Sequence, residues 1–292
     1  MKLFINCVAG IVLSGACMLH VAAPSRIAGN GPFVIRPMPA RAAHHLQAPR
    51  MRFWDGVSIT DLNWSGYAVE TNLSNPTSGA VTGVTGSWTV PTVTPTSADA
   101  YSATWVGIDG DSDDTVEQIG TEQDVTPSGQ TDYYVWFEMY PEGAYYIEGF
   151  PVAPGNIFSA QVKYLGTTTA TERVGRRRTV LSAEEFQLTI TNVTQNVTFT
   201  VPPSYTTVTF SAQRSSAEWI MEAPSSYFGV LPMADYNSVA FSNCAATLEG
   251  VTGPINDASW ANEAITASND GTLSTPGPLN GSGNGFTITW SQ

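Results

Sequence analysis

Apolar and polar residues alternate over many short stretches of this chain. Such alternation over about four to eight positions is typical of strands with one buried face. Turn clusters rich in Gly, Pro, Asn and Ser separate the stretches, and no long segment has a helical period. The pattern therefore predicts an all-β fold, an antiparallel β-sandwich. The clearest predicted strands are 64–69, 85–90, 103–108, 133–140, 157–164, 186–190, 197–201, 239–241 and 286–290.

The N-terminal region differs from the rest of the chain. Residues 1–23 begin with Lys2, continue as a mostly apolar run and end in small residues, which is typical of a cleaved export signal. A single membrane anchor is the alternative, but polar residues interrupt the run. Residues 24–55 contain Pro and Arg without a clear period, so we interpret them as a propeptide or leader. Residues 56–292 then form one domain, and we expect a secreted protein.

Charge is divided unevenly between the leader and the domain. All 25 acidic residues lie at or after Asp55, whereas six of the 12 basic residues precede it. From residue 53 onward the balance is 6 − 25 = −19, which makes nucleic acid an improbable partner. A basic leader beside an acidic domain suggests a pro-segment held by charge and released when acid protonates the carboxylates. The alternative is a linker that happens to lack acids.

One basic run interrupts the acidic domain, at residues 173–178. We predict a solvated loop there, with a processing site as the weaker alternative.

Cysteine and histidine usage excludes several chemistries. Cys7 and Cys17 lie in the predicted signal, so Cys244 is alone in the domain and we expect it to be a buried small hydrophobe without a disulfide. All three histidines precede residue 46, which leaves none in the domain. Ser-His-Asp and Cys-His catalysis and His-containing zinc sites are therefore excluded. Acid–base work then falls to carboxylates, which titrate usefully at low pH.

Two carboxylate chemistries need separate consideration. The chain contains no Asp-Thr-Gly or Asp-Ser-Gly, so a pepsin-like aspartic protease is improbable. A glycoside hydrolase also uses two carboxylates, and the many Trp and Tyr residues fit stacking on sugars. A glycoside hydrolase and a non-catalytic carbohydrate-binding sandwich therefore stay open as alternatives.

Several segments, taken together and in order, resemble the eqolisin family of glutamic endopeptidases. Trp-Val-Gly-Ile-Asp-Gly is followed by Gln-x-Gly and, about a hundred residues later, by Ala-Glu-Trp-Ile. The resemblance covers roughly residues 60–245 and becomes loose after about residue 247. The six segments are 63–67, 86–91, 104–110, 117–121, 133–141 and 217–220.

The resemblance implies a sandwich of two large, bent antiparallel sheets, similar to concanavalin-like jelly rolls. It implies a catalytic pair formed by Gln118 and Glu218, with Trp105 and Asp109 nearby. It also implies a preproprotein with a basic propeptide, in agreement with the charge division. Because fungal members usually have disulfides and this domain cannot form one, the chain is expected to be a prokaryotic relative.

The expected chemistry follows from the two groups. An ionised Glu218 can take a proton from water as general base and return it to the departing amine, provided that its pKa is not strongly raised. The Gln118 amide can donate to the carbonyl oxygen as negative charge builds. We also predict substrate-binding roles for Trp105, Asp109, Glu138 and Tyr133, with a solvated strand position as the alternative for Glu138.

No cofactor or metal is expected. The run 109–114 is rich in carboxylates that could suit calcium, but its spacing does not match an EF-hand loop. The expected partners are protein or peptide substrates and the chain's own propeptide, with no membrane contact after signal removal. We expect a monomer.

Overall fold

The computed structural model describes residues 33–38, 53–54, 58–174, 177–226 and 229–291. The predicted export signal, residues 1–23, lies outside these ranges. Short strands dominate the described chain, which contains a single one-turn helix, α1 (Pro203–Thr206). A separate two-stranded ribbon pairs β15 (Ser225–Ser226) with β16 (Gly229–Val230).

The first layer is a long sheet that carries five of the six motif segments, and the sixth, residues 86–91, lies in the second layer. In spatial order its strands are β1 (Val34–Pro37), β9 (Tyr145–Glu148), β8 (Thr131–Tyr140), β7 (Val116–Val125), β6 (Ala103–Ile108), β14 (Ser216–Glu222), β4 (Trp64–Glu70), β19 (Ala261–Ser268), β3 (Ser58–Asp61) and β2 (Phe53–Trp54). Neighbouring strands are antiparallel, except that β3 runs parallel to β19.

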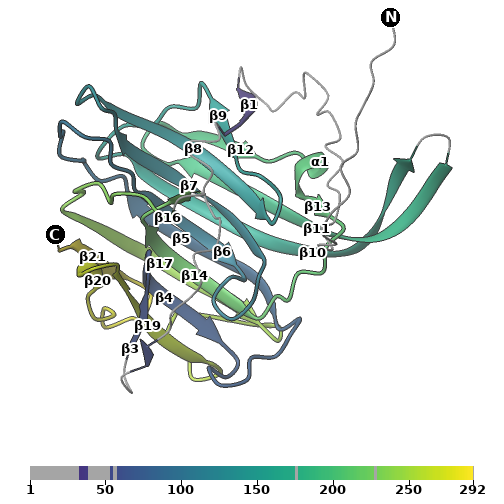
Figure 1. Ribbon diagram of the computed structural model, residues 1–292. Coiled ribbons are helices and arrows are strands. Elements are labelled where there is room, and N and C mark those ends of the chain that lie inside the picture. The colour runs from purple at the N-terminus through teal and green to yellow at the C-terminus, as the bar shows by residue number, and fades with distance from the viewer. Residues whose placement is uncertain (1–32, 39–52, 55–57, 175–176, 227–228, 292) are drawn as a thin grey trace, which may run out of the picture.

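The second layer continues from β19, which also pairs with β20 and so joins the layers along one side. Its spatial order is β20 (Thr272–Pro276), β21 (Phe286–Trp290), β17 (Ser238–Leu248), β5 (Val81–Thr89), β10 (Ile157–Val174) and β11 (Arg177–Asn192). Three shorter strands are added to it: β18 (Val251–Gly253) pairs with β17, and β12 (Val197–Thr200) and β13 (Thr207–Val208) pair with β11. Figure 1 shows how strongly the strands bend.

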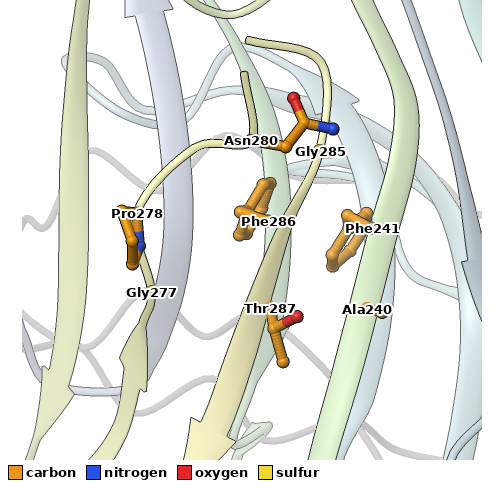
Figure 2. A pocket seen from close by; sticks show the side chains of 8 residues that line it. All are labelled: Ala240, Phe241, Gly277, Pro278, Asn280, Gly285, Phe286 and Thr287. Carbon is orange, nitrogen blue, oxygen red and sulfur yellow. The ribbon is translucent and has the colours of Figure 1, made fainter. Parts of the chain in front are cut away.

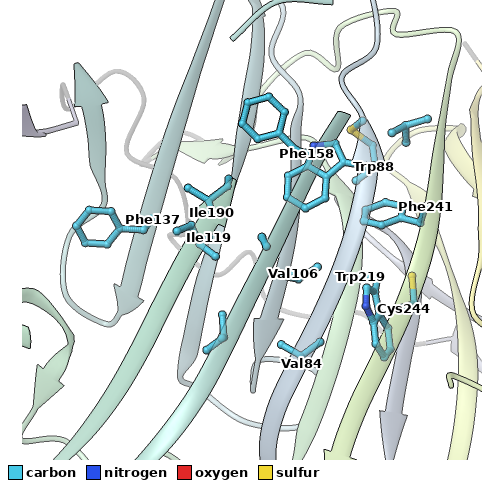
Figure 3. Close-up of a cluster of buried hydrophobic side chains, with 14 of the residues drawn as sticks. Val84, Trp88, Val106, Ile119, Phe137, Phe158, Ile190, Trp219, Phe241 and Cys244 are labelled. Atoms are coloured by element: carbon cyan, nitrogen blue, oxygen red, sulfur yellow. The ribbon is translucent and has the colours of Figure 1, made fainter. Parts of the chain in front are cut away.

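The main hydrophobic core fills the space between the two layers (Figure 3). Two indole N–H groups cross it: Trp88 donates to the Thr121 hydroxyl at 2.9 Å and Trp219 donates to the Thr85 carbonyl at 2.7 Å. Because an unpaired buried N–H is costly, these bonds fix how the layers sit on each other. Cys244 is buried in this core, which confirms the sequence prediction.

The predicted all-β antiparallel sandwich is confirmed, and each predicted stretch falls on a strand. The prediction of a loop at residues 173–178 is wrong. β10 continues to Val174 and β11 starts at Arg177, with Arg173 directly opposite Arg178 in the ladder. Local composition suggested a loop, but pairing between the two strands extends the hairpin to its end.

The hairpin made by β10 and β11 extends beyond the body of the sandwich (Figure 1). β10 pairs with β5 only from Ile157 to Lys163, and from Gly166 onward β10 is paired with β11 alone. The outer half is therefore a two-stranded ribbon, a form that gains little stability by itself.

Candidate active site

Gln118 and Glu218 lie on strands that flank the same central strand. β6 pairs with β7 on one side and with β14 on the other. In these registers Gly107 is directly opposite Gln118 and also directly opposite Glu218. Residues that are directly opposite in a ladder project from the same face of a sheet. The fold therefore brings the amide and the carboxylate, a hundred residues apart, to one face. We call it the dyad face.

Gly107 places no side chain between Gln118 and Glu218. Two strand spacings put the Cα atoms of Gln118 and Glu218 about 10 Å apart. A Cβ at Gly107 would come within 2.8 Å of the Trp105 ring and 3.2 Å of the Gln118 Cβ. The glycine therefore makes room for the edge of the Trp105 ring, which lies close over Gly107 beside the dyad.

The Glu218 carboxylate is fully buried. Burial raises its pKa well above the ordinary value, the Ser216 hydroxyl opposes this by hydrogen bonding, and the carboxylates of Asp111, Asp109 and Asp113 raise the pKa further. This differs from the sequence-based requirement that the pKa not be strongly raised. Burial in this form therefore favours the protonated form of Glu218 over the ionised form that a base needs.

Gln118 is also fully buried, and its amide is oriented by a neighbour. Its Nε2 donates to Glu138 Oε2 at 3.1 Å, and β8 places Glu138 directly opposite Gln118 on the dyad face. One N–H of the amide is thus used, and the other N–H is left for a second acceptor. The prediction that Glu138 faces the site agrees with this geometry. The contact that the structure records is to Gln118.

Asp109 has a positive φ of 68° and ends the strand that carries Gly107. Its buried carboxylate accepts the backbone N–H of Arg214 at 2.6 Å and that of Ser215 at 2.7 Å, and the Thr115 hydroxyl at 3.3 Å. These bonds tie the end of β6 to the residues just before β14. Asp109 therefore holds the two strands in register, and its carboxylate is occupied by the protein itself.

Trp105 lies two residues before Gly107, on the dyad face. Its indole N–H donates to Glu222 Oε2 at 2.9 Å, and the Asn63 amide donates to Glu222 Oε1 at 2.9 Å. The Trp64 ring packs edge-on against Trp105 with centroids 4.8 Å apart. Trp105 is thus a fixed part of the wall beside Gly107, and its substrate-binding role stays a prediction.

Tyr133 requires a correction. It packs partly against the core between the layers, and its hydroxyl accepts the Val93 backbone N–H at 3.1 Å. Strand alternation therefore puts Tyr133 on the face opposite to Glu138. The family motif located the strand correctly, but the motif alone does not say which of two adjacent tyrosines faces the site.

Several carboxylates on the dyad face were not predicted, Glu222 and Glu263 among them. Glu222 follows Glu218 by four residues on β14, and a strand pattern alone would have placed both on one face. Glu263 lies on β19 opposite Ala68, which is itself opposite Glu218. No local signal marks Glu263, because its place depends on pairing between strands distant in the chain.

Other features of the described residues do not form a second site of this kind. Among them, no group of three or more His, Cys, Asp or Glu side chains is arranged to hold a metal ion. None of the described helices has the length and apolar character needed to cross a membrane. A hollow of about 340 Å³ includes Gly277, whose carbonyl accepts the Tyr67 hydroxyl from the core side of β4. The hollow therefore lies on the core side of the first layer, opposite to the dyad face. Figure 2 shows the residues that line it: Ala240, Phe241, Gly277, Pro278, Asn280, Gly285, Phe286 and Thr287.

Comparison with known proteins agrees with this geometry. Residues 62–290 match the model of the peptidase A4 family. Aspergillopepsin-2 from Aspergillus niger is 29% identical over 231 residues, which are 72% of this chain and 73% of that protein. Two solved structures share the fold: scytalido-glutamic peptidase with a transition-state analogue inhibitor (TM-score 0.57, 20% identity) and SCP-B, an eqolisin in complex with the tripeptide Ala-Ile-His (TM-score 0.54, 19% identity). Each covers 79% of this chain and 98% of its own.

The matched fold and family define the class, a β-sandwich peptidase. The chain belongs to the peptidase A4 family, the glutamic peptidases or eqolisins, and is a glutamic endopeptidase. The resemblance found in the motifs is thereby confirmed, and the carbohydrate-binding and glycoside hydrolase alternatives are set aside. The prokaryotic origin stays a prediction.

Proposed function

We propose that this chain is a secreted endopeptidase that acts in acid and hydrolyses peptide bonds with Gln118 and Glu218. The observation that supports the pair is the shared register at Gly107, which gives both side chains one face with only a glycine between them on β6. No other chemistry is needed from the chain. Glu218 supplies a base, and Gln118 supplies a hydrogen-bond donor whose state does not change with pH in the acid range.

In the proposed reaction the substrate carbonyl lies between Gln118 and Glu218. Ionised Glu218 removes a proton from water as the oxygen of water attacks the carbonyl carbon. Gln118 donates its free N–H to the carbonyl oxygen as negative charge develops there. Glu218 then returns the proton to the nitrogen as the peptide C–N bond breaks, which leaves a carboxylic acid and an amine.

The experiment compares proteolysis of a denatured protein at acid pH by the acid-activated wild-type chain and its variants. Glu218→Gln should abolish cleavage, because an amide cannot accept the proton. Gln118→Ala should lower kcat by about 10²–10³, the usual cost of one lost oxyanion donor. The matched controls are Glu249→Gln and Gln130→Ala, both exposed, which should cleave like wild type. Cleavage by Glu218→Gln at the wild-type rate would refute the assignment.

We further propose that the leader keeps the full-length chain inactive. A polypeptide cannot reach Gln118 and Glu218 while both are fully buried, so something must leave the dyad face before catalysis. Met38, in the leader, packs against the cluster on that face formed by Trp64, Ala68, Ala103, Trp105, Val116, Trp136, Ile220 and Ile265. Opening the face would also rehydrate Glu218 and bring its pKa back toward the range in which a carboxylate ionises in acid.

Mass spectrometry of the full-length chain during acid incubation tests the leader. We expect the N-terminus to move to a position near residues 50–60 as activity appears. Full activity in a chain that keeps its leader after prolonged acid exposure would count against this role. The Glu218→Gln variant should stay uncut when incubated alone, which would identify the cleavage as self-processing.

A further inference from the structure

A short segment of the leader forms a strand of the catalytic sheet. Residues Val34–Pro37 make β1, antiparallel to β9, with Ile35 opposite Ile147. The ladder continues one residue further, where the Met38 N–H donates to the Ala144 carbonyl at 2.9 Å. β1 therefore occupies the outer edge of β9, a position that an extended peptide can fill through main-chain hydrogen bonds alone.

Alternate side chains of this segment pack against an apolar surface formed by Ile147, Phe150 and Phe199, which we call the seat. The Phe33 ring lies 5.2 Å from the Phe150 ring and 6.1 Å from the Phe199 ring, centroid to centroid. Ile35 packs partly against the same core beside Ile147. The seat thus takes two apolar residues separated by one position, which is how strand-addition sites select their ligands.

The side chains of the residue between these two apolar positions and of the residue after them project from the other face of the strand. Val34 is exposed, and Arg36 forms an ion pair with Glu148 at 2.9 Å, with the two side chains 53% and 50% exposed. An ion pair this exposed contributes little affinity. It does favour a basic residue after the second apolar one.

The segment ends level with the dyad. Because Phe137 lies opposite Tyr145, Ala144 is level with Glu138, which is directly opposite Gln118. Met38 is therefore three strand spacings, or about 14 Å, from Gln118 in the same row. An extended chain covers that distance in about four residues.

We propose that the β9 edge is a binding site for an extended segment of protein substrates, N-terminal to the bond that is cleaved. The segment it fits has an apolar residue, any residue, an apolar residue and a basic residue. In the full-length chain, residues 33–38 occupy the site. The inference rests on the proposed function, in which acid processing frees the edge.

The physical reason is that removal of β1 leaves two open surfaces together. The main-chain N–H and C=O groups of β9 lose their partners, and the seat formed by Ile147, Phe150 and Phe199 meets water. A substrate that fills both surfaces is held near the dyad by a second attachment, which raises the local concentration of its scissile bond.

The test uses peptides that share one scissile sequence and differ in an extension placed at least four residues N-terminal to it. One peptide has no extension, one carries Phe-Val-Ile-Arg-Pro-Met, and one carries Ser-Val-Ser-Arg-Pro-Met with the same charge. A fourth repeats the second with an N-methyl group on Met, which removes the N–H that donates to Ala144. The enzyme is the acid-activated chain with its N-terminus determined.

We expect the Phe-Val-Ile-Arg-Pro-Met extension to lower KM about tenfold with kcat unchanged, and the other two extensions to give no gain. Free acetyl-Phe-Val-Ile-Arg-Pro-Met-amide should raise the KM of the extended substrate alone. In the unprocessed chain, Ile35→Asp should weaken the binding of residues 33–38 to the β9 edge. It should therefore increase the binding of a fluorescently labelled form of the free peptide. Equal KM values for all four substrates, or equal inhibition of long and short substrates by the free peptide, would overturn the inference. Failure to cleave the short peptide at all would instead refute the proposed function.

Discussion

At the scale of single residues, Gly107 is the position on β6 directly between Gln118 and Glu218. Two strand spacings set the distance across the dyad, and glycine is the smallest residue that the central strand can offer there. Gly107 has no positive φ to explain it, so its value is the close approach of the Trp105 ring and the Gln118 side chain.

We therefore expect Gly107→Ala to lower kcat by at least about tenfold, because the new methyl group presses on the Trp105 ring and on the Gln118 side chain and displaces them. Overpacking of this kind also lowers the free energy of unfolding, by about 1–3 kcal/mol. Kinetics on a peptide substrate and thermal unfolding measure the two effects. Gly83→Ala is the matched control, since its Cβ would meet nothing closer than 3.6 Å. Equal activity in both variants would contradict the role of the close packing at Gly107.

Glu138 offers a second prediction at this scale. Since the Gln118 amide is oriented by donating to Glu138, Glu138→Ala should lower kcat by about tenfold while leaving the KM of short peptides nearly unchanged. Glu138→Gln keeps an acceptor oxygen and should recover most of the loss. A change in KM alone would show that Glu138 contacts substrate instead of positioning the amide.

At the scale of elements, the two strands that carry the dyad could not be found from periodicity. β7 reads Val-Glu-Gln-Ile-Gly-Thr-Glu-Gln-Asp-Val and β14 reads Ser-Ala-Glu-Trp-Ile-Met-Glu, and both are buried along their whole length. A strand buried on both faces is expected to be apolar, and one with a single buried face is expected to alternate. Polar residues at buried positions fit neither pattern.

The family motifs supplied what the pattern could not. They pointed to Gln118 and Glu218 as a pair, and the ladder then gave both one face. The sequence alone did not show that Gly107 separates them, that Tyr133 turns away or that Glu263 lies in the same row. Each of these depends on the register between strands far apart in the chain, which local side-chain chemistry does not encode.

The hairpin of β10 and β11 carries its own prediction. Beyond Thr168 and Ala183 its two strands pair only with each other, and none of the described residues between these two positions belongs to the main hydrophobic core. Replacing residues 169–182 with Asn-Gly, which forms a tight hairpin turn, should change the free energy of unfolding by less than about 1 kcal/mol. Acid proteolysis should also be retained. Loss of activity on peptide substrates in a fully folded variant would show that the ribbon takes part in catalysis.

At the scale of the whole molecule, buried carboxylates make stability depend on pH in an unusual direction. Burial raises the pKa of Asp124 to about 7, and burial raises the pKa values of Glu117, Glu122 and Glu218 well above the ordinary range. Unfolded carboxyl groups titrate near pH 4. Between pH 4 and pH 7 the folded state therefore binds more protons than the unfolded state, and the free energy of unfolding falls as pH rises.

We predict a higher Tm at pH 4 than at pH 7, measured by calorimetry in the Glu218→Gln background so that self-cleavage does not interfere. The matched test is Glu117→Gln, because Glu117 is fully buried and burial is the main cause of its raised pKa. This change should raise the free energy of unfolding by about 1–3 kcal/mol at pH 7 and have little effect at pH 4. The exposed Glu249→Gln should change neither value. A Tm that rises from pH 4 to pH 7 would contradict the prediction.

The described part of the leader meets the catalytic sheet in two places, through β1 at one margin and through β2, which pairs with β3 of the domain, at the other. A single cut between these two places severs the chain but breaks none of the contacts that hold β1 on β9. The N-terminal fragment would remain as a separate peptide whose departure depends on how far the solution is diluted. Newly processed enzyme should therefore show lower specific activity at high protein concentration, and washing should restore it.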